Sequence, residues 1–198
     1  MFERYTERAA RVIFLARYEA SRFGSLTIET EHLLLGILME EPDMIERFAR
    51  PGETADSVRA RVEQQITRRP AFPTETDIPL SAPSKVALSR AAEEADRLMH
   101  RFITTEHLFL GLLQGKTGPT GGLLCFRPLR LNFGRTLAEK EDPTATLLAD
   151  AGVALEPVRN ILANTQREEL LRRGQQPNPA MEKLLRDFSA AKGSAAHD

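Results

Sequence analysis

The chain contains 198 residues, of which 41% are hydrophobic and 28% are charged, and its formal net charge is −1. These values are typical of a soluble protein, and a charge so close to zero argues against binding to nucleic acid or to a membrane surface. The single cysteine, Cys125, excludes a disulfide within the chain and fits a reducing compartment. Neither a leader peptide nor an apolar run long enough to cross a bilayer is visible, so we expect a cytoplasmic protein.

Apolar residues recur at helical spacing along most of the chain. Ala9, Val12, Ala16 and Ala20, for example, fall on one face of a helix that Gly24 would end. The pattern predicts eight helices, at residues 6–23, 30–41, 43–49, 56–67, 84–99, 105–114, 144–151 and 156–166. We therefore expect an all-α fold.

An internal repeat is the most informative feature of the sequence. IETEHLLLGIL at residues 28–38 returns as ITTEHLFLGLL at residues 103–113, with eight of eleven positions identical. The same offset of 75 residues aligns Glu19 with Glu94 and Arg22 with Arg97. Two copies of one supersecondary unit pack together because neither buries its apolar face alone. We expect two pseudo-symmetric four-helix repeats in one bundle, with function located where the copies meet.

The repeats divide the chain into segments. Residues 1–67 form the first repeat and residues 84–166 the second, and a proline-rich linker at residues 68–83 joins them. Val58 aligns best with Val158, an offset of 100, so the second repeat carries an insert at about residues 115–141. The insert is glycine-rich at its start and apolar toward its end. Residues 167–198 read as a C-terminal tail, in which residues 181–191 have the spacing of one further helix.

These residues resemble the N-terminal double-repeat (Clp repeat) domain of Clp unfoldases, most closely the ClpC and ClpA branch. The resemblance is carried by the opening FERYTERA at residues 2–9 and by the TEHL[LF]LG stretch that occurs once in each repeat. It covers about residues 1–166 apart from the insert. Where the family usually has glycine before that stretch, this chain has Glu29 and Thr104. Residues 111–117 only approximate a phosphate-binding loop, and a helix precedes them where a strand is required. The chain thus looks like the N-domain alone, without ATPase modules.

The resemblance implies a role in binding proteins. In the Clp family this domain is not catalytic and receives adaptors and substrates for ATP-dependent proteolysis. In the ClpC branch it is also associated with phosphorylated arginine, through the glutamates of the motif. The resemblance therefore implies that Glu31 and Glu106 bind the ligand, beside Thr30 and Thr105. Carboxylates bind guanidinium groups through paired hydrogen bonds, and helix N-termini offer N–H groups to phosphate.

The same residues also have a structural explanation. Thr30 and Thr105 are expected to be N-caps, and an acid in the first helical turn stabilises a helix without any ligand. We expect His32 and His107 to be structural and to form hydrogen bonds across the repeat junction. No cofactor and no metal site are expected, because the sequence has neither a His-x-x-x-His pair nor a cysteine cluster.

Two functions from different classes follow. The first is a non-enzymatic binding module whose partner is a Clp ATPase, an adaptor or a substrate protein, with phosphoarginine as a candidate ligand. The alternative is a regulator with a small-molecule or peptide pocket at the repeat junction, unrelated to proteolysis. Co-purification with a Clp ring or its adaptor would discriminate between them. The sequence shows no recognisable pair of nucleophile and base, so we do not expect an enzyme.

Overall fold

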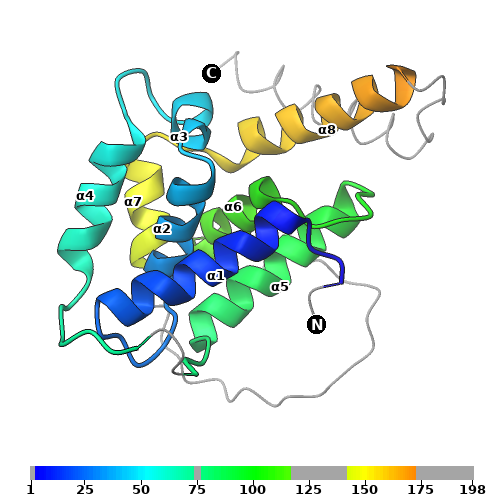
Figure 1. Cartoon of the computed structure of the whole chain (residues 1–198). Coiled ribbons are helices and arrows are strands. Elements are labelled where there is room, and N and C mark those ends of the chain that lie inside the picture. The colour runs from blue at the N-terminus through cyan, green and yellow to red at the C-terminus, as the bar shows by residue number, and fades with distance from the viewer. Residues whose placement is uncertain (1–2, 74–76, 117–141, 173–198) are drawn as a thin grey trace.

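The computed structural model of the chain describes residues 3–73, 77–116 and 142–172 (Figure 1). These ranges contain α1 (Glu7–Arg22), α2 (Thr30–Glu40), α3 (Asp43–Phe48), α4 (Ala55–Gln65), α5 (Ala82–Arg97), α6 (Thr105–Leu113), the short 3-10 helix η1 (Gln114–Lys116), α7 (Pro143–Asp150) and α8 (Leu155–Arg172). The expected all-α fold is confirmed. Most of the expected insert, residues 117–141, and the helix expected at residues 181–191 lie outside the described residues.

Two element boundaries differ from the sequence prediction. α8 continues to Arg172, six residues past its expected end, because the first strong helix breakers after it are Gly174 and Pro177. In Figure 1, α8 extends past the end of the bundle. α5 begins two residues earlier than expected, because Ser81 caps it by accepting a hydrogen bond from the Ser84 N–H, and its proline falls in the first turn, where proline is tolerated.

The two repeats, α1–α4 and α5–α8, are joined reciprocally. Tyr5, which precedes α1, forms a parallel β-bridge with Ile103, which precedes α6. Leu80, which precedes α5, forms the equivalent bridge with Ile28, which precedes α2. Backbone hydrogen bonds of 2.7–3.0 Å close both bridges. Each repeat is therefore attached, through the residues leading into its first helix, to the second helix of the other repeat.

The glycine of each TEHL[LF]LG stretch lies where two helices cross closely. A Cβ atom on Gly36 of α2 would stand 2.5 Å from the carbonyl oxygen of Val12 in α1. A Cβ atom on Gly111 of α6 would stand 2.2 Å from the carbonyl oxygen of Ala87 in α5. No side chain fits at either distance. The repeated glycine is thus explained by the packing of the first two helices in each repeat.

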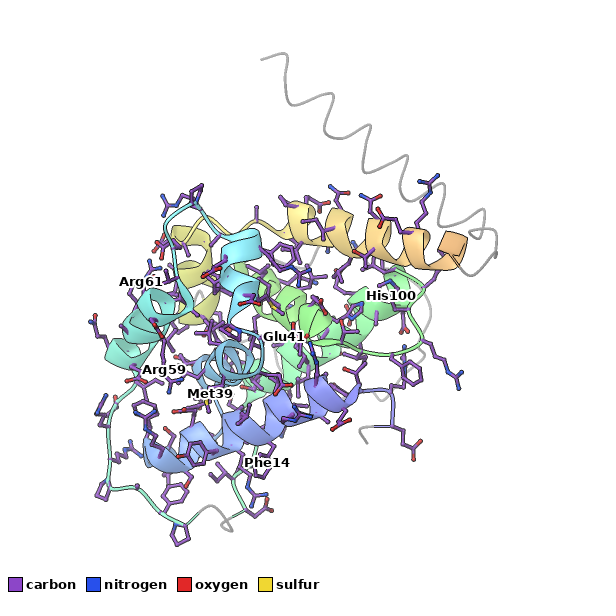
Figure 2. The ribbon with its side chains drawn as sticks, turned by 45° about the horizontal axis from the view of Figure 1, so that its top comes forward. Phe14, Met39, Glu41, Arg59, Arg61 and His100 are labelled. Atoms are coloured by element: carbon purple, nitrogen blue, oxygen red, sulfur yellow. The ribbon has the colours of Figure 1, made fainter. Side chains whose placement is uncertain are left out.

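A buried ion pair ties the first helix of each repeat to the last. Glu19 on α1 and Glu94 on α5 are each only 1% exposed. Glu19 accepts a 2.8 Å hydrogen bond from Arg59, which reaches across from α4 (Figure 2). Glu94 accepts a 2.8 Å hydrogen bond from the Nε–H of Arg159 on α8. Because a buried carboxylate is unfavourable unless it is paired, these arginines stabilise the fold.

Candidate functional site

The candidate site is built around the start of α2 and its counterpart at the start of α6. The helices begin at Thr30 and Thr105, so the N-caps are Glu29 and Thr104. The sequence prediction that Thr30 and Thr105 are the N-caps is wrong by one residue. In both repeats the N-cap backbone N–H donates a 2.9 Å hydrogen bond to Nδ1 of the histidine three residues later. This capping box places the N-cap one residue before each threonine.

The two motif histidines are buried, and their hydrogen bonds stay within their own repeat. His32 Nε2 lies 3.2 Å from Ser25 Oγ, and His107 Nε2 lies 2.8 Å from Nδ1 of His100, in the loop after α5 (Figure 2). The expectation that they form hydrogen bonds across the repeat junction is therefore wrong. Nδ1 of each ring caps its own helix, and Nε2 contacts the loop before that helix. Burial lowers the pKa of both His32 and His107 to about 4. Each is neutral at pH 7, as a hydrogen-bond acceptor at Nδ1 must be.

The side chain of Thr30 contacts the other repeat. Its hydroxyl donates to Asp142 Oδ1 at 2.9 Å and accepts from Thr144 Oγ1 at 3.0 Å, both at the start of α7. Thr105 has no equivalent contact, because a proline and a methionine occupy the aligned positions at the start of α3. The two threonines therefore have different surroundings: Thr30 meets polar groups of the other repeat, and Thr105 does not.

The two motif glutamates have different neighbours. An oxygen of Glu106 lies 3.6 Å from a guanidinium nitrogen of Arg47 on α3. The residue that aligns with Arg47 in the second repeat is Leu147, which is buried and carries no charge. Among the residues that the structure describes, Glu31 makes no ion pair. Repeat symmetry is thus broken at the two residues that the sequence singled out.

The pKa values of the two carboxyl groups move in opposite directions. Burial, followed by the negative charges of Asp142 and Glu29, raises the pKa of Glu31. Burial acts in the same direction at Glu106, but hydrogen bonds from a threonine hydroxyl and the backbone, together with the charge of Arg47, bring its pKa below the ordinary value. Negative charge therefore accumulates around Glu31 and is compensated around Glu106.

A cavity of about 400 Å³ adjoins Glu31. It lies between the start of α2, the end of α4 and the first linker residues, and its walls include Thr27, Glu29, Glu31, Gln65, Thr67 and Arg69. The backbone N–H of Arg69 donates to the carbonyl oxygen of Phe23 at 2.9 Å, which holds the linker against this edge. Within the described part of the chain, none of the three charged side chains forms an ion pair. The cavity therefore offers two carboxylates and a guanidinium to a ligand that carries both charges.

A second cavity, of about 430 Å³, lies between the segment before α1 and helix α5. Its walls are mainly apolar and include Tyr5, Leu80, Leu88 and Ile103, which come from both repeats. Among the described residues, no three histidine, cysteine, aspartate or glutamate side chains gather as a metal site would require. None of the described helices has the length and apolar character needed to span a bilayer.

Sequence reasoning identified Glu31 and Glu106 but missed two features of the site. The cavity beside Glu31 depends on how the linker folds back, which the repeat pattern does not indicate. Arg47 was visible in principle, because the 100-residue offset aligns it with Leu147. That difference in charge between the copies was the signal that the two glutamates are not equivalent.

Comparisons with known proteins agree with this architecture. The profile of the Clp repeat (R) N-terminal domain matches residues 4–125. Over 125 residues the chain is 39% identical to the ATP-dependent Clp protease ATP-binding subunit ClpA homolog of Cyanidium caldarium. Over the same length it is 38% identical to the chloroplast chaperone protein ClpC1 of Arabidopsis thaliana. Both alignments cover 63% of this chain but only 14% and 13% of the relatives, so the chain spans about one seventh of their length.

Solved structures show the same fold. The N-terminal domain of ClpD from Arabidopsis thaliana superposes with a TM-score of 0.54 at 21% identity, covering 84% of this chain and 97% of that one. The Hsp104 N-terminal domain of Candida albicans superposes with a TM-score of 0.54 at 14% identity, covering 79% and 87%. The matched family is a non-catalytic module. With its two reciprocal repeats, its duplicated motif and its profile match, the chain belongs to the Clp repeat N-terminal domain family and resembles the domains of ClpC, ClpA and Hsp104.

Proposed function

We propose that this chain is a non-enzymatic receiver of polypeptides, and that the cavity beside Glu31 binds an arginine-phosphorylated side chain. Family membership supports the first part, because Clp N-domains are modules that bind proteins. The partner in this proposal is a Clp ATPase, an adaptor or a substrate protein. The chain would then act on proteolysis by delivering substrates or by competing for adaptors.

One observation carries the second part of the proposal. The cavity beside Glu31 combines two carboxylates with the guanidinium of Arg69, and none of these groups forms an ion pair with another described side chain. A phosphoarginine side chain carries a guanidino group and a phosphoryl group next to each other. The carboxylates match the first and Arg69 matches the second.

Burial favours such a ligand at Glu31. The raised pKa of Glu31 reflects a carboxylate that is partly removed from water and lies near other negative charges. A cationic group placed there offsets the repulsion between these negative charges. An exposed glutamate would gain less from a cation, because water already screens its charge. Hydrogen bonds to charged groups contribute about 1.5–3 kcal/mol, which corresponds to roughly a ten- to hundredfold effect on affinity.

Isothermal titration calorimetry tests the proposal. The protein is titrated with phosphoarginine, with an arginine-phosphorylated peptide and with the same peptide unphosphorylated. We expect saturable binding of the phosphorylated ligands only. Glu31→Gln, which keeps the size of the side chain, should weaken it at least tenfold, whereas Glu93→Gln, at an exposed position on α5, should not. Equal binding of both peptides, or no binding by a protein that circular dichroism shows to be folded, would contradict the proposal.

The apolar cavity at the repeat junction favours a second candidate function. A small molecule or an apolar peptide bound among Tyr5, Leu88 and Ile103 would contact both repeats at once. In that case binding would be insensitive to Glu31→Gln and would be lost when Leu88→Asp introduces a charge into the cavity wall. Calorimetry on these two variants separates the two functions.

A further inference from the structure

We infer that the two repeats are not equivalent receivers: the first is open, and at the second Arg47 of the same chain competes with the ligand. This inference rests on the proposed function, because it assumes that a motif glutamate binds the guanidino group of the ligand. In the second repeat, that position is taken by a guanidinium that the protein supplies itself.

The contacts of Arg47 hold it at this position. Its guanidinium lies 3.6 Å from Glu106 and stacks over the ring of Phe48, at 5.0 Å from the centroid. The ring of Phe48 packs in turn against Phe109 of α6, with 6.1 Å between the centroids. The arginine is thereby fixed to the same helix that carries Glu106, and its pairing is built into the contact between α3 and α6.

The first repeat lacks this internal cation. The position aligned with Arg47 is Leu147, and the nearest charge that α7 brings to Glu31 is the carboxylate of Asp142, bound to the Thr30 hydroxyl. One glutamate therefore faces an arginine and the other an aspartate. A cationic ligand gains attraction at Glu31, whereas at Glu106 it must displace a cation already present.

The ion pair between Arg47 and Glu106 competes only moderately with a cationic ligand. The side chains of Arg47 and Glu106 are 43% and 19% exposed, so solvent screens their attraction. An ion pair of this exposure shifts an equilibrium by about fivefold at most. Removing Arg47 should therefore strengthen binding at Glu106 by about that factor. A peptide with two modified arginines should therefore gain less avidity from the wild-type chain than from Arg47→Ala.

Calorimetry with phosphoarginine as the probe tests the inference. We expect a tighter site in the wild-type chain that Glu31→Gln removes, and a second site about fivefold weaker that Glu106→Gln removes. Arg47→Ala should bring the affinity of the second site close to that of the first, and Arg47→Lys, which keeps the charge, should behave like the wild type. Arg47 is largely exposed, so these variants are expected to fold.

The outcomes separate this inference from the proposed function. Two sites of similar affinity in the wild type, or a single site that depends on Glu106, would overturn the inference but keep the phosphoarginine receiver. A single site with no gain in Arg47→Ala would also overturn it. No binding by either the wild type or Arg47→Ala would overturn both. Carbon NMR titration gives a readout without ligand: Arg47→Ala should raise the pKa of Glu106, and an unchanged value would show that the ion pair does not form.

Discussion

Replacing Arg159 with methionine is expected to destabilise the protein strongly. The side chains of Arg159 and Glu94 are 8% and 2% exposed, and the guanidinium donates through both Nε and a terminal nitrogen to the two carboxylate oxygens. Without it the carboxylate stays buried, with the Gln114 amide at 2.8 Å and Arg97 at 4.0 Å as its nearest partners. Removing one member of a buried ion pair costs about 3–5 kcal/mol. Since Gln114 still donates a hydrogen bond, we expect a loss of about 3 kcal/mol.

The first repeat provides a matched control. Arg59 is 27% exposed, and after Arg59→Met the buried Glu19 still accepts a 2.9 Å hydrogen bond from Arg22. Solvent access and this remaining partner should limit the loss to about 1–2 kcal/mol. The two variants differ in position but remove the same chemical group from the same place in the repeat.

Urea unfolding followed by circular dichroism measures both losses. In a thermal melt of a chain of this length, each kcal/mol of lost stability lowers the melting temperature by about 2–4 °C. Arg159→Met should therefore melt roughly 6–12 °C below the wild type. Adding Glu94→Leu to Arg159→Met should restore part of the stability, because it removes the unpaired charge. Equal losses in the two single variants, or no recovery in the double variant, would refute the reasoning.

Three further predictions concern the helix starts and ends. The pKa of about 4 for His32 and His107 lies below the ordinary 6.5, so the unfolded chain binds more protons than the folded chain between these pH values. The stability of the fold should be full above pH 6.5 and fall by up to about 3 kcal/mol per histidine as the pH drops toward 4. His32→Gln should make stability less dependent on pH in urea titrations across that range. Thr30→Val should cost about 1–2 kcal/mol because it leaves the buried Thr144 hydroxyl without its acceptor and removes the hydrogen bond to Asp142, whereas Thr105→Val, which breaks no contact across the junction, should cost less in the same assay. Met99 has a positive φ of 57°, so Met99→Gly should raise the melting temperature through a gain of about 1 kcal/mol; a lower melting temperature would show that the methionine side chain matters more than its backbone.

The sequence was a good guide to the helices and to their duplication. Periodic apolar residues and the repeated motif predicted all eight described α-helices, because both follow from local chemistry and from burial of one helical face. The prediction failed at the start of α2, where an N-cap was expected at Thr30. A histidine three residues after the N-cap replaces the usual glutamate or glutamine of a capping box, so the local signal was not recognised.

The features that decide the site depend on tertiary contacts. The pattern identified Glu31 and Glu106 as equivalent, but their neighbours come from the start of α7 and from α3, about 110 and 60 residues away in the sequence. The Thr30 hydroxyl, expected to cap its own helix, instead contacts Asp142 in the other repeat. Such pairings follow from how the repeats dock, and no local periodicity encodes them.

The measurement that tests the central claim most directly is a nitrogen–proton NMR titration of the full chain with an arginine-phosphorylated peptide. The account predicts saturable shifts of the backbone amides at residues 29–33 and near Arg69, around the cavity beside Glu31. Residues 104–108 at the second repeat should shift only at about fivefold higher ligand concentration. Shifts centred on residues 104–108, or on the apolar cavity lined by Tyr5 and Leu88, would contradict the account.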